Sequence, residues 1–255
     1  MRVTFLGTGA AGGVPLYGCS CMACQSAHLE AQRVRRPCSA LVEAAGTRVL
    51  VDAGLMDLHE RFPPGSLDAI VLTHFHPDHV QGLFHLRWGK GQPVTVYGPP
   101  DSEGCADLYK HPGLLKFVAV HKHEPFQIEA LRWTPLPLIH SKPTLGYAIE
   151  GPCSSRWAYL TDTLGLPPSS ASFLKDWGPF DMAIDCSYPP TDAPKNHNDW
   201  HAAIGCGIQT GARTTWLTHL SHTVDDWLLR EQPVLPIGVQ VAHDGLFVDL
   251  SAQPR

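Results

Sequence analysis

The segment Leu72–His79 constrains this chain more than any other feature, because it reads Leu-Thr-His-Phe-His-Pro-Asp-His. Three imidazoles and a carboxylate fall within six residues, directly after the run Asp68–Leu72, which is typical of a buried strand. Both kinds of group are ligands for zinc, manganese and iron. Four of them cannot all bind one tetrahedral ion in good geometry, so the spacing favours two adjacent ions. The alternative is a surface loop that is histidine-rich by chance, in a chain with 15 histidines.

The composition indicates a globular chain, because 255 residues with a hydrophobic share of 44% can bury a substantial core. A net charge of −5 argues against broad electrostatic binding to nucleic acid or anionic lipid. Met1–Leu6 leads directly into a Gly-Thr-Gly turn without the apolar segment of a signal peptide, and no apolar stretch approaches the ~18 residues of a membrane span. We therefore expect a cytoplasmic protein with no membrane partner and no stable nucleic-acid partner.

Short apolar runs alternate with glycine and proline along the whole chain, which predicts a single α/β domain over residues 1–255. We expect strands over 3–6, 40–43, 48–52, 69–73, 94–97, 132–138, 146–150, 157–161, 182–185, 214–218, 238–242 and 246–250. We expect helices over about 55–62, 79–86, 102–110, 169–176, 198–209 and 223–230. The pattern contains no repeat and no linker long enough to divide the chain.

Several polar residues share one position, at or just beyond the C-terminal end of an apolar run. They are His74, His140, Asp162, Asp185 and His219. Ligand groups converge at strand ends in layered α/β proteins, so separate strands can bring these residues together.

The His-x-His-x-Asp-His motif and the strand before it resemble the dinuclear site of the metallo-β-lactamase superfamily. The resemblance implies a four-layer αβ/βα sandwich and a hydrolase with two metal sites that share a carboxylate. The first site comprises His74, His76 and His140, the second Asp78, His79 and His219, and the bridge is Asp162. Asp52 also matches a superfamily pattern, and we expect it to orient the histidine loop by hydrogen bonds rather than to bind metal.

A second metal site is indicated by three cysteines in the pattern Cys-x-Cys-x-x-Cys, at positions 19, 21 and 24. The thiolates of Cys19, Cys21 and Cys24 suit tetrahedral zinc, which needs a fourth ligand. His222, three residues after His219, is our candidate for that ligand. We therefore predict a zinc-binding loop at about 18–25 that holds one structural Zn²⁺; the alternative is three unpaired thiols in a glycine-rich loop.

The segment Gly7–Gly12 has the pattern Gly-x-Gly-x-x-Gly after a strand, which resembles a dinucleotide-binding fingerprint. That fingerprint needs a helix to follow at once, so that the helix N-terminus meets the pyrophosphate. Gly13, Pro15 and Gly18 prevent such a helix. We expect the turn to bring backbone close to the metal pocket instead.

Further short segments narrow the resemblance to the PhnP-type cyclic phosphodiesterases of the superfamily, over residues from about 3 to about 249. These segments are the cysteines with His222, Gly12–Pro15, Tyr97–Pro100, His111–Leu115, His140–Lys142, Asp185–Pro190 and Asn196–Asn198. The resemblance implies opening of 5-phosphoribosyl 1,2-cyclic phosphate to ribose 1,5-bisphosphate in phosphonate degradation. It also implies a homodimer and two Mn²⁺ at the catalytic pair, although Zn²⁺ and Fe²⁺ suit the same ligands. Activity on 2′,3′-cyclic nucleotides stays open.

His197 is our candidate for the general acid, because imidazole donates protons near neutral pH and this residue matches the acid–base histidine of the family. Asp78 is expected to act in catalysis as a metal ligand. We predict that Ser141 and Lys142 contact the anionic substrate.

Three other functions compete with this one. A PqqB-like protein of quinone-cofactor biosynthesis shares the early glycine and cysteine loop, but the intact segment His74–His79 and its downstream ligands disfavour it. A nuclease of the tRNA 3′-processing type needs an inserted basic arm, and none is visible in the sequence. A metal-stabilised binding scaffold without activity predicts that a ligand is missing, whereas all seven candidates are present.

Overall fold

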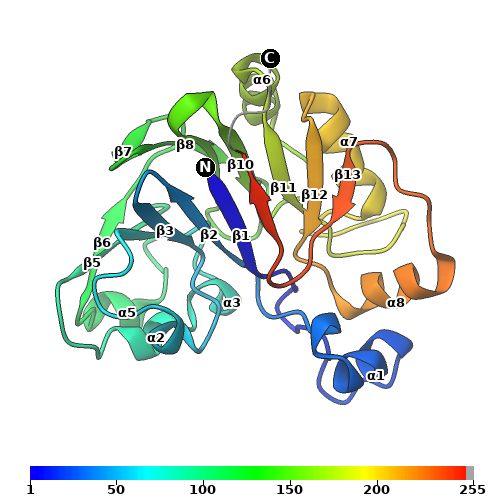
Figure 1. Ribbon diagram of the computed structural model, residues 1–255, viewed down its shortest axis with the longest axis horizontal. Helices are drawn as coiled ribbons and strands as arrows, with labels where there is room; N and C mark the ends of the chain where they lie inside the picture. The colour runs from blue at the N-terminus through cyan, green and yellow to red at the C-terminus, as the bar shows by residue number, and fades with distance from the viewer. Residues whose placement is uncertain (251–255) are drawn as a thin grey trace.

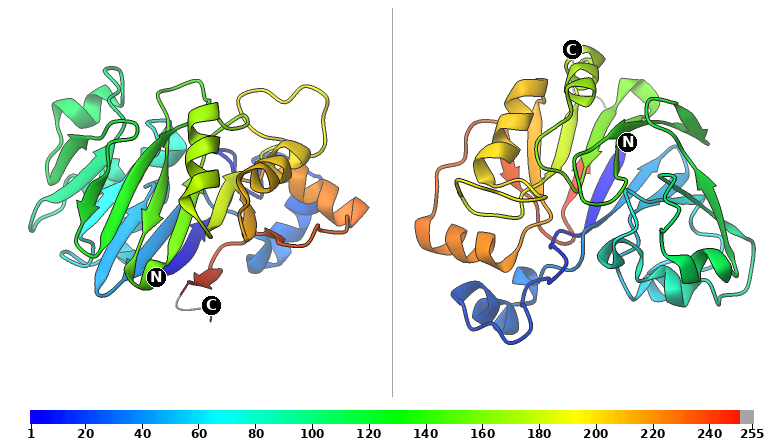
Figure 2. Two further views of the ribbon diagram at one scale, coloured as in Figure 1. Left: turned by 90° about the horizontal axis from the view of Figure 1, so that it is seen from above. Right: turned by 180° about the vertical axis from the view of Figure 1, so that it is seen from behind.

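The chain forms two seven-stranded mixed sheets that face each other, with helices on the outer sides (Figure 1). The structure, a computed structural model, describes residues 1–250, so the last five residues of the predicted domain lie outside the described part. The view from above in Figure 2 shows the same layers. The expected four-layer αβ/βα sandwich is confirmed.

The first sheet has the order β14-β1-β2-β3-β4-β5-β6, and its strands β3 to β6 are parallel. Its strands are β1 (Arg2–Gly7), β2 (Ser39–Ala44), β3 (Thr47–Val51), β4 (Ala69–Val71), β5 (Val94–Gly98), β6 (Leu115–Ala119) and β14 (Phe247–Asp249). The second sheet has the order β13-β12-β11-β10-β9-β8-β7, and its strands β10 to β13 are parallel. Its strands are β7 (Phe126–Ile128), β8 (Leu131–Pro137), β9 (Leu145–Glu150), β10 (Arg156–Leu160), β11 (Asp181–Asp185), β12 (Thr214–Thr218) and β13 (Val239–Val241).

Strand β10 shows why its residues form a central strand. Trp157 and Tyr159 point into the core between the sheets, while Ala158 and Leu160 face the helical layer on the other side. Side chains alternate across a strand, so a strand covered on both faces is apolar at every position. Burial of each large side chain stabilises the fold by about 1.5–3 kcal/mol.

The helices form the outer layers. The first sheet is covered by α2 (Leu58–Arg61), α3 (Pro77–Val80), α4 (Leu83–Leu86) and α5 (Ala106–Lys110), and the second by α6 (Pro168–Trp177) and α7 (Trp200–Thr210). Helices α1 (Met22–Leu29) and α8 (His222–Glu231) lie side by side at one end of the sandwich (Figure 1). Two 3-10 turns, η1 (Ala31–Arg33) and η2 (Pro152–Ser154), complete the elements of the described residues. None of these helices is long and apolar enough to cross a bilayer.

The sequence-based strands are all present, but two further strands and one helix were not predicted. Strands β6 and β7 lie at the outer edges of the two sheets, where short strands depend on a single neighbour. Helix α1 begins at Met22, so the second half of the segment 18–25, which we predicted as a loop, is helical. The buried face of α1 consists of Ala23, Cys24 and Ala27, and this small apolar patch is stabilised by tertiary packing.

The single helix predicted over 79–86 is also wrong, because α3 ends at Val80 and α4 begins at Leu83. Gly82 lies between them, and a side-chain Cβ at this position would come within 2.1 Å of the Leu55 carbonyl oxygen. The Gly82 N–H donates to the Ala53 carbonyl oxygen at 2.9 Å, and the glycine packs closely against the segment after β3.

Candidate metal centres

The parallel strands of both sheets deliver their C-terminal ends to one place, where the predicted ligands meet. His74 follows β4, Asp162 follows β10 and His219 follows β12. Helix α3 begins at Pro77, whose ring presets the backbone angle of a first helical turn. This turn carries Asp78 into the same site.

The first cluster consists of His74, His76, His140 and Asp162, whose ligand atoms all lie within 4.8 Å of one another. His76 Nδ1 lies 2.9 Å from His74 Nε2 and 3.0 Å from His140 Nε2. Asp162 Oδ2 lies 3.7 Å from each of the two Nε2 atoms.

Hydrogen bonds on the outer side of the first cluster determine where the imidazole protons are. His74 Nδ1 lies 3.0 Å from Thr73 Oγ1, which itself donates to the Asp52 carboxylate. His140 Nδ1 lies 3.0 Å from the Asn196 carbonyl oxygen, which can only accept. Each Nδ1 therefore carries the proton, and both Nε2 atoms present lone pairs to His76. Nitrogen lone pairs at such distances fit a bound cation.

The second cluster consists of Asp78, His79, His219 and the same Asp162, again within 4.8 Å. His79 Nε2 lies 3.3 Å from Asp78 Oδ2 and 3.4 Å from Asp162 Oδ2. His219 Nε2 lies 3.5 Å from Asp78 Oδ2 and 3.3 Å from Asp162 Oδ1.

Three buried atoms of the second cluster have no hydrogen-bond partner within residues 1–250: His79 Nε2, His219 Nε2 and Asp162 Oδ1. Buried polar atoms without a partner are costly, and here all three face the centre of the cluster. Their arrangement fits a second cation. Asp162 belongs to both clusters, which is the position that a bridging carboxylate requires.

Asp52 holds the histidine loop from behind, as its sequence context predicts. Its Oδ1 accepts the Thr73 backbone N–H at 2.8 Å, and its Oδ2 lies 2.8 Å from His79 Nδ1. Asp52 and His79 are both fully buried. The Nδ1–H of His79 therefore donates to Asp52, and Nε2 faces the metal site.

Without bound metal, the two clusters differ in protonation. Burial lowers the pKa of each histidine in the first cluster, and that of His74 falls well below its usual value. In the second cluster burial also opposes the charged form of His219, but Asp162, Asp78 and Asp185 together outweigh it and raise the pKa of that residue to about 9. The pKa of His79 is likewise raised, by Asp52 and Asp162. Ion binding at the second cluster must therefore displace protons.

A cavity of about 400 Å³ opens directly onto the clusters. Ala10–Gly12 form part of its wall, so the glycine-rich turn lies beside the metal pocket, as predicted. His197 lies on the same wall, and its Nδ1 is 2.7 Å from Asp185 Oδ2. The ring of His197 stacks on that of His219, with 5.1 Å between the centroids.

The predicted substrate contacts lie near the first cluster but outside the residues that line this cavity. Ser141 Oγ is 3.5 Å from His76 Nε2. Lys142 Nζ is 3.4 Å from Asp101 Oδ2, and the Asp101 side chain is nearly buried. The substrate role of Ser141 and Lys142 stays a prediction.

Sequence reasoning missed three residues that support the ligands: Thr73, Ser187 and Asn196. Ser187 Oγ lies 2.9 Å from His219 Nδ1, although 32 positions separate the two residues. Thr73 precedes His74 in the motif, and Asn196 contributes only its backbone carbonyl to His140. No local pattern could assign the contacts of Ser187 and Asn196, because their partners come from other strands or loops.

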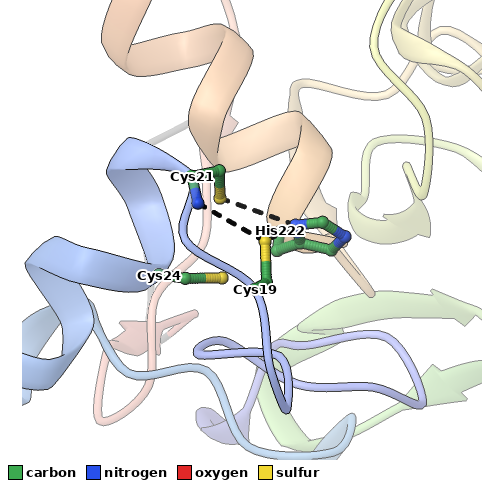
Figure 3. A group of neighbouring side chains, drawn as sticks. All are labelled: Cys19, Cys21, Cys24 and His222. Carbon is green, nitrogen blue, oxygen red and sulfur yellow. Dashed lines mark hydrogen bonds between the residues drawn. The ribbon is translucent and has the colours of Figure 1, made fainter.

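The cysteine cluster joins the first turns of α1 and α8 (Figure 3). The ligand atoms of Cys19, Cys21, Cys24 and His222 all lie within 4.8 Å of one another. His222 Nδ1 is 3.4 Å from Cys19 Sγ and 3.6 Å from Cys21 Sγ. Three thiols and one imidazole in this arrangement fit a closed tetrahedral zinc site.

The surroundings of the thiols also suit a metal. A backbone N–H of Cys21 points at Cys19 Sγ and lowers the pKa of Cys19, whereas burial raises the pKa of Cys24 to about 12. Bound zinc deprotonates its thiol ligands outright, so it would convert Cys24 to the thiolate.

Replacing Cys21 by serine is expected to remove the zinc and to lower the free energy of unfolding by about 2 kcal/mol or more, because a closed thiolate site stabilises the fold directly. For a chain of this size, that loss corresponds to about 4–8 °C in Tm. Elemental analysis and thermal unfolding measure both effects. The matched control is Cys153→Ser, since Cys153 is exposed and lies outside the cluster. Unchanged zinc content in the Cys21 variant would show that the cysteine cluster does not bind zinc.

Comparison with known proteins places the chain in a family. Residues 47–220 match the family model of the beta-lactamase superfamily domain. The chain belongs to this superfamily. A ribonuclease Z of Methanopyrus kandleri is 28% identical over 82% of this chain and 89% of its own length. An octanoyltransferase of Porphyromonas gingivalis is 32% identical over 96% of this chain, which spans only 51% of that relative.

Solved structures agree with the family. The crystal structure of a diphosphatase from the PhnP family is similar with a TM-score of 0.79 and 29% identity, and the match covers 97% of each chain. Zn²⁺-bound PqqB from Methylobacterium extorquens matches with a TM-score of 0.76 over 98% of this chain and 100% of its own. Its identity of 23% supports the shared fold alone.

Proposed function

We propose that this chain is a metal-dependent phosphodiesterase that opens a cyclic phosphodiester, with 5-phosphoribosyl 1,2-cyclic phosphate as its substrate and ribose 1,5-bisphosphate as its product. One observation carries the proposal: a proton donor, His197, lies in the wall of the cavity onto which both metal clusters open. Two divalent ions at phosphorus and an acid at the leaving oxygen both accelerate water attack on a phosphodiester. The site offers candidates for each.

The two clusters would hold Mn²⁺, and Zn²⁺ and Fe²⁺ suit the same imidazole and carboxylate ligands. When bound, the ions supply Lewis acidity to the phosphoryl oxygens and activate the attacking water. The imidazoles of the first cluster are neutral, so they would not offset the positive charge of a bound ion. Asp78 would help to hold the second ion, Asp162 belongs to both clusters, and their negative charges would limit the repulsion between two bound ions.

His197 supplies the proton in this proposal. Its Nδ1–H donates to the Asp185 carboxylate, so Nε2 is the atom left to face the substrate. As the phosphorus–oxygen bond to the leaving group breaks, Nε2–H protonates that oxygen, and the attacking water provides the new oxygen on phosphorus. The ring then regains a proton from solvent. Nearby, Ser141 and Lys142 are proposed to contact the anionic part of the substrate.

The cellular role that we propose follows from the resemblance to the PhnP-type phosphodiesterases. We propose that the protein works as a cytoplasmic homodimer in phosphonate degradation, with one structural Zn²⁺ in each chain. The PqqB-like function is the less favoured alternative, because every ligand of the two clusters is in place. The ribonuclease alternative draws support from the relative in Methanopyrus kandleri, and it shares the chemistry of phosphodiester cleavage.

Product analysis after reconstitution with Mn²⁺ separates these functions. We expect rapid conversion of phosphoribosyl 1,2-cyclic phosphate to the 1,5-bisphosphate, and slower opening of a nucleoside 2′,3′-cyclic phosphate. A precursor tRNA in the same assay should remain uncut. Cleavage of the tRNA with an inert cyclic sugar phosphate would favour the ribonuclease, and loss of activity with chelator checks the metal requirement.

A further inference from the structure

We propose that Asp185 is a positioning residue that orients the proton donor His197 with one carboxylate oxygen and the metal ligand His219 with the other, through the hydroxyl of Ser187. The His197 half of this inference rests on the proposed function. The His219 half concerns metal affinity and does not depend on the substrate.

The burial and hydrogen bonds of Asp185 support this role. Asp185 is the last residue of β11 and is fully buried between the strands that end near Asp162 and His219. Its Oδ2 lies 2.7 Å from His197 Nδ1 and accepts the Thr163 backbone N–H at 3.0 Å. Two donors from different loops therefore converge on one buried oxygen, and the Thr163 bond also fastens the residue that follows Asp162.

The second oxygen leads to the metal ligand. Ser187 Oγ lies 2.7 Å from Asp185 Oδ1 and 2.9 Å from His219 Nδ1. The Asp185 carboxylate and the His219 carbonyl oxygen, which lies 2.9 Å from the same Oγ, both accept only. The single hydroxyl proton is therefore used by one of these two acceptors, and His219 Nδ1–H donates to the hydroxyl oxygen. The ring nitrogen that remains, Nε2, faces Asp78 and Asp162, and its lone pair becomes available to a metal ion once its proton is displaced. Ser187 thus selects the tautomer of His219 that can bind a metal.

The backbone around His197 is fastened to the same strand. The buried side chain of Asn198 donates to the Asp185 carbonyl oxygen at 3.1 Å and accepts the Gly165 N–H at 2.6 Å. His197 therefore cannot move far from Asp185 while this loop is folded. His197 lines the cavity, and the contact with Asp185 fixes its side chain from behind.

Substitutions at Ser187 and Asp185 separate the two branches of the proposal, the contact of Asp185 with His197 and its contact with His219 through Ser187. Ser187→Ala removes the hydroxyl that orients His219, so the second catalytic Mn²⁺ should bind about 10–100-fold more weakly, as is usual for partners of metal ligands. Ser187→Thr keeps a hydroxyl and should restore the affinity. Asp185→Asn removes the carboxylate that both branches share. It should weaken Mn²⁺ binding and also lower kcat at saturating Mn²⁺ by about 10²-fold or more on the cyclic ester.

Matched controls lie in the same sheet and beside it. Asp181→Asn removes a carboxylate from the opposite end of β11, where Asp181 pairs with Arg213 away from the site. Ser170→Ala removes an equally buried hydroxyl, which donates to Pro137. Both controls should lose some stability and keep the Mn²⁺ affinity of the unaltered protein.

Manganese titration with a competing chelator and turnover of two substrates provide the measurements. Asp185→Asn should lose much less turnover on bis(p-nitrophenyl) phosphate, whose leaving group needs no proton, than on the cyclic ester. Equal losses on both substrates would overturn the His197 branch, and normal Mn²⁺ affinity in Ser187→Ala would overturn the His219 branch. If the unaltered protein hydrolysed neither phosphodiester, the proposed function would fail, while the Mn²⁺ titration would still decide the His219 branch.

Discussion

Replacing Asp162 by alanine is expected to lower turnover by about 10³-fold or more, because the Lewis acidity of two bridged ions is worth several kcal/mol in the transition state. Asp162 is almost fully buried and is the one residue that both catalytic clusters share. Without its carboxylate the imidazoles of His79 and His219 keep only Asp78 as a shared anionic neighbour among the residues of the two clusters. At least one Mn²⁺ per chain should therefore be missing after reconstitution.

The cysteine cluster provides the internal control for this variant. Cys19 and His222 contact neither Asp162 nor its partners, so one Zn²⁺ per chain should remain bound and the thermal transition should stay cooperative. Elemental analysis of zinc and manganese and the turnover of the cyclic ester are measured on the same preparation. Two catalytic ions with near-normal turnover in the Asp162→Ala protein would refute the bridging role.

Replacing His197 by alanine is expected to lower kcat by about 10²–10⁴-fold on a cyclic ester with an alkoxide leaving group, because the proton donor is lost. Both catalytic ions should bind almost normally. His197 Nδ1 faces Asp185 rather than the centre of either catalytic cluster, and each cluster has four other ligand candidates.

The leaving group distinguishes this role from a positional one. Bis(p-nitrophenyl) phosphate releases a stable anion, so the loss in the His197→Ala variant should be much smaller on that substrate. A loss of equal size on both substrates would assign His197 to positioning or to the metals. The exposed His201 on α7 offers a control, since His201→Ala removes an imidazole outside both clusters.

Local patterns were sufficient for the parts of the site that lie close together in the chain. The ligands from His74 to His79 fall on one loop behind one apolar strand, so the motif and the strand could be recognised together. The same holds for the C-x-C-x-x-C spacing, which the structure brings to His222. Asp162 and His219 were found by their place at strand ends, because parallel strands present those ends at a common edge.

The local patterns missed two of the four edge strands and one helix. Strands β6 and β7 each have one neighbouring strand, so their extended form depends on the sheet that they join. Helix α1 has only a narrow apolar face, which is covered by α8. The break at Gly82 results from a close approach to Leu55, which no periodicity in the sequence records.

By itself, the sequence determined the superfamily, the strand-and-loop origin of the candidate metal ligands and the kinds of side chain that they carry, because these depend on residue type and short spacing. The tertiary structure brings Asp162 into both clusters, as the superfamily resemblance implied, and it alone decided that Asp185 faces His197 and that Ser187 bonds His219. These contacts join residues from different strands, and their distances depend on the register of the sheets. The strength of a side-chain hydrogen bond changes when its distance changes by a few tenths of an ångström. Sequence patterns specify only which strand end carries each group.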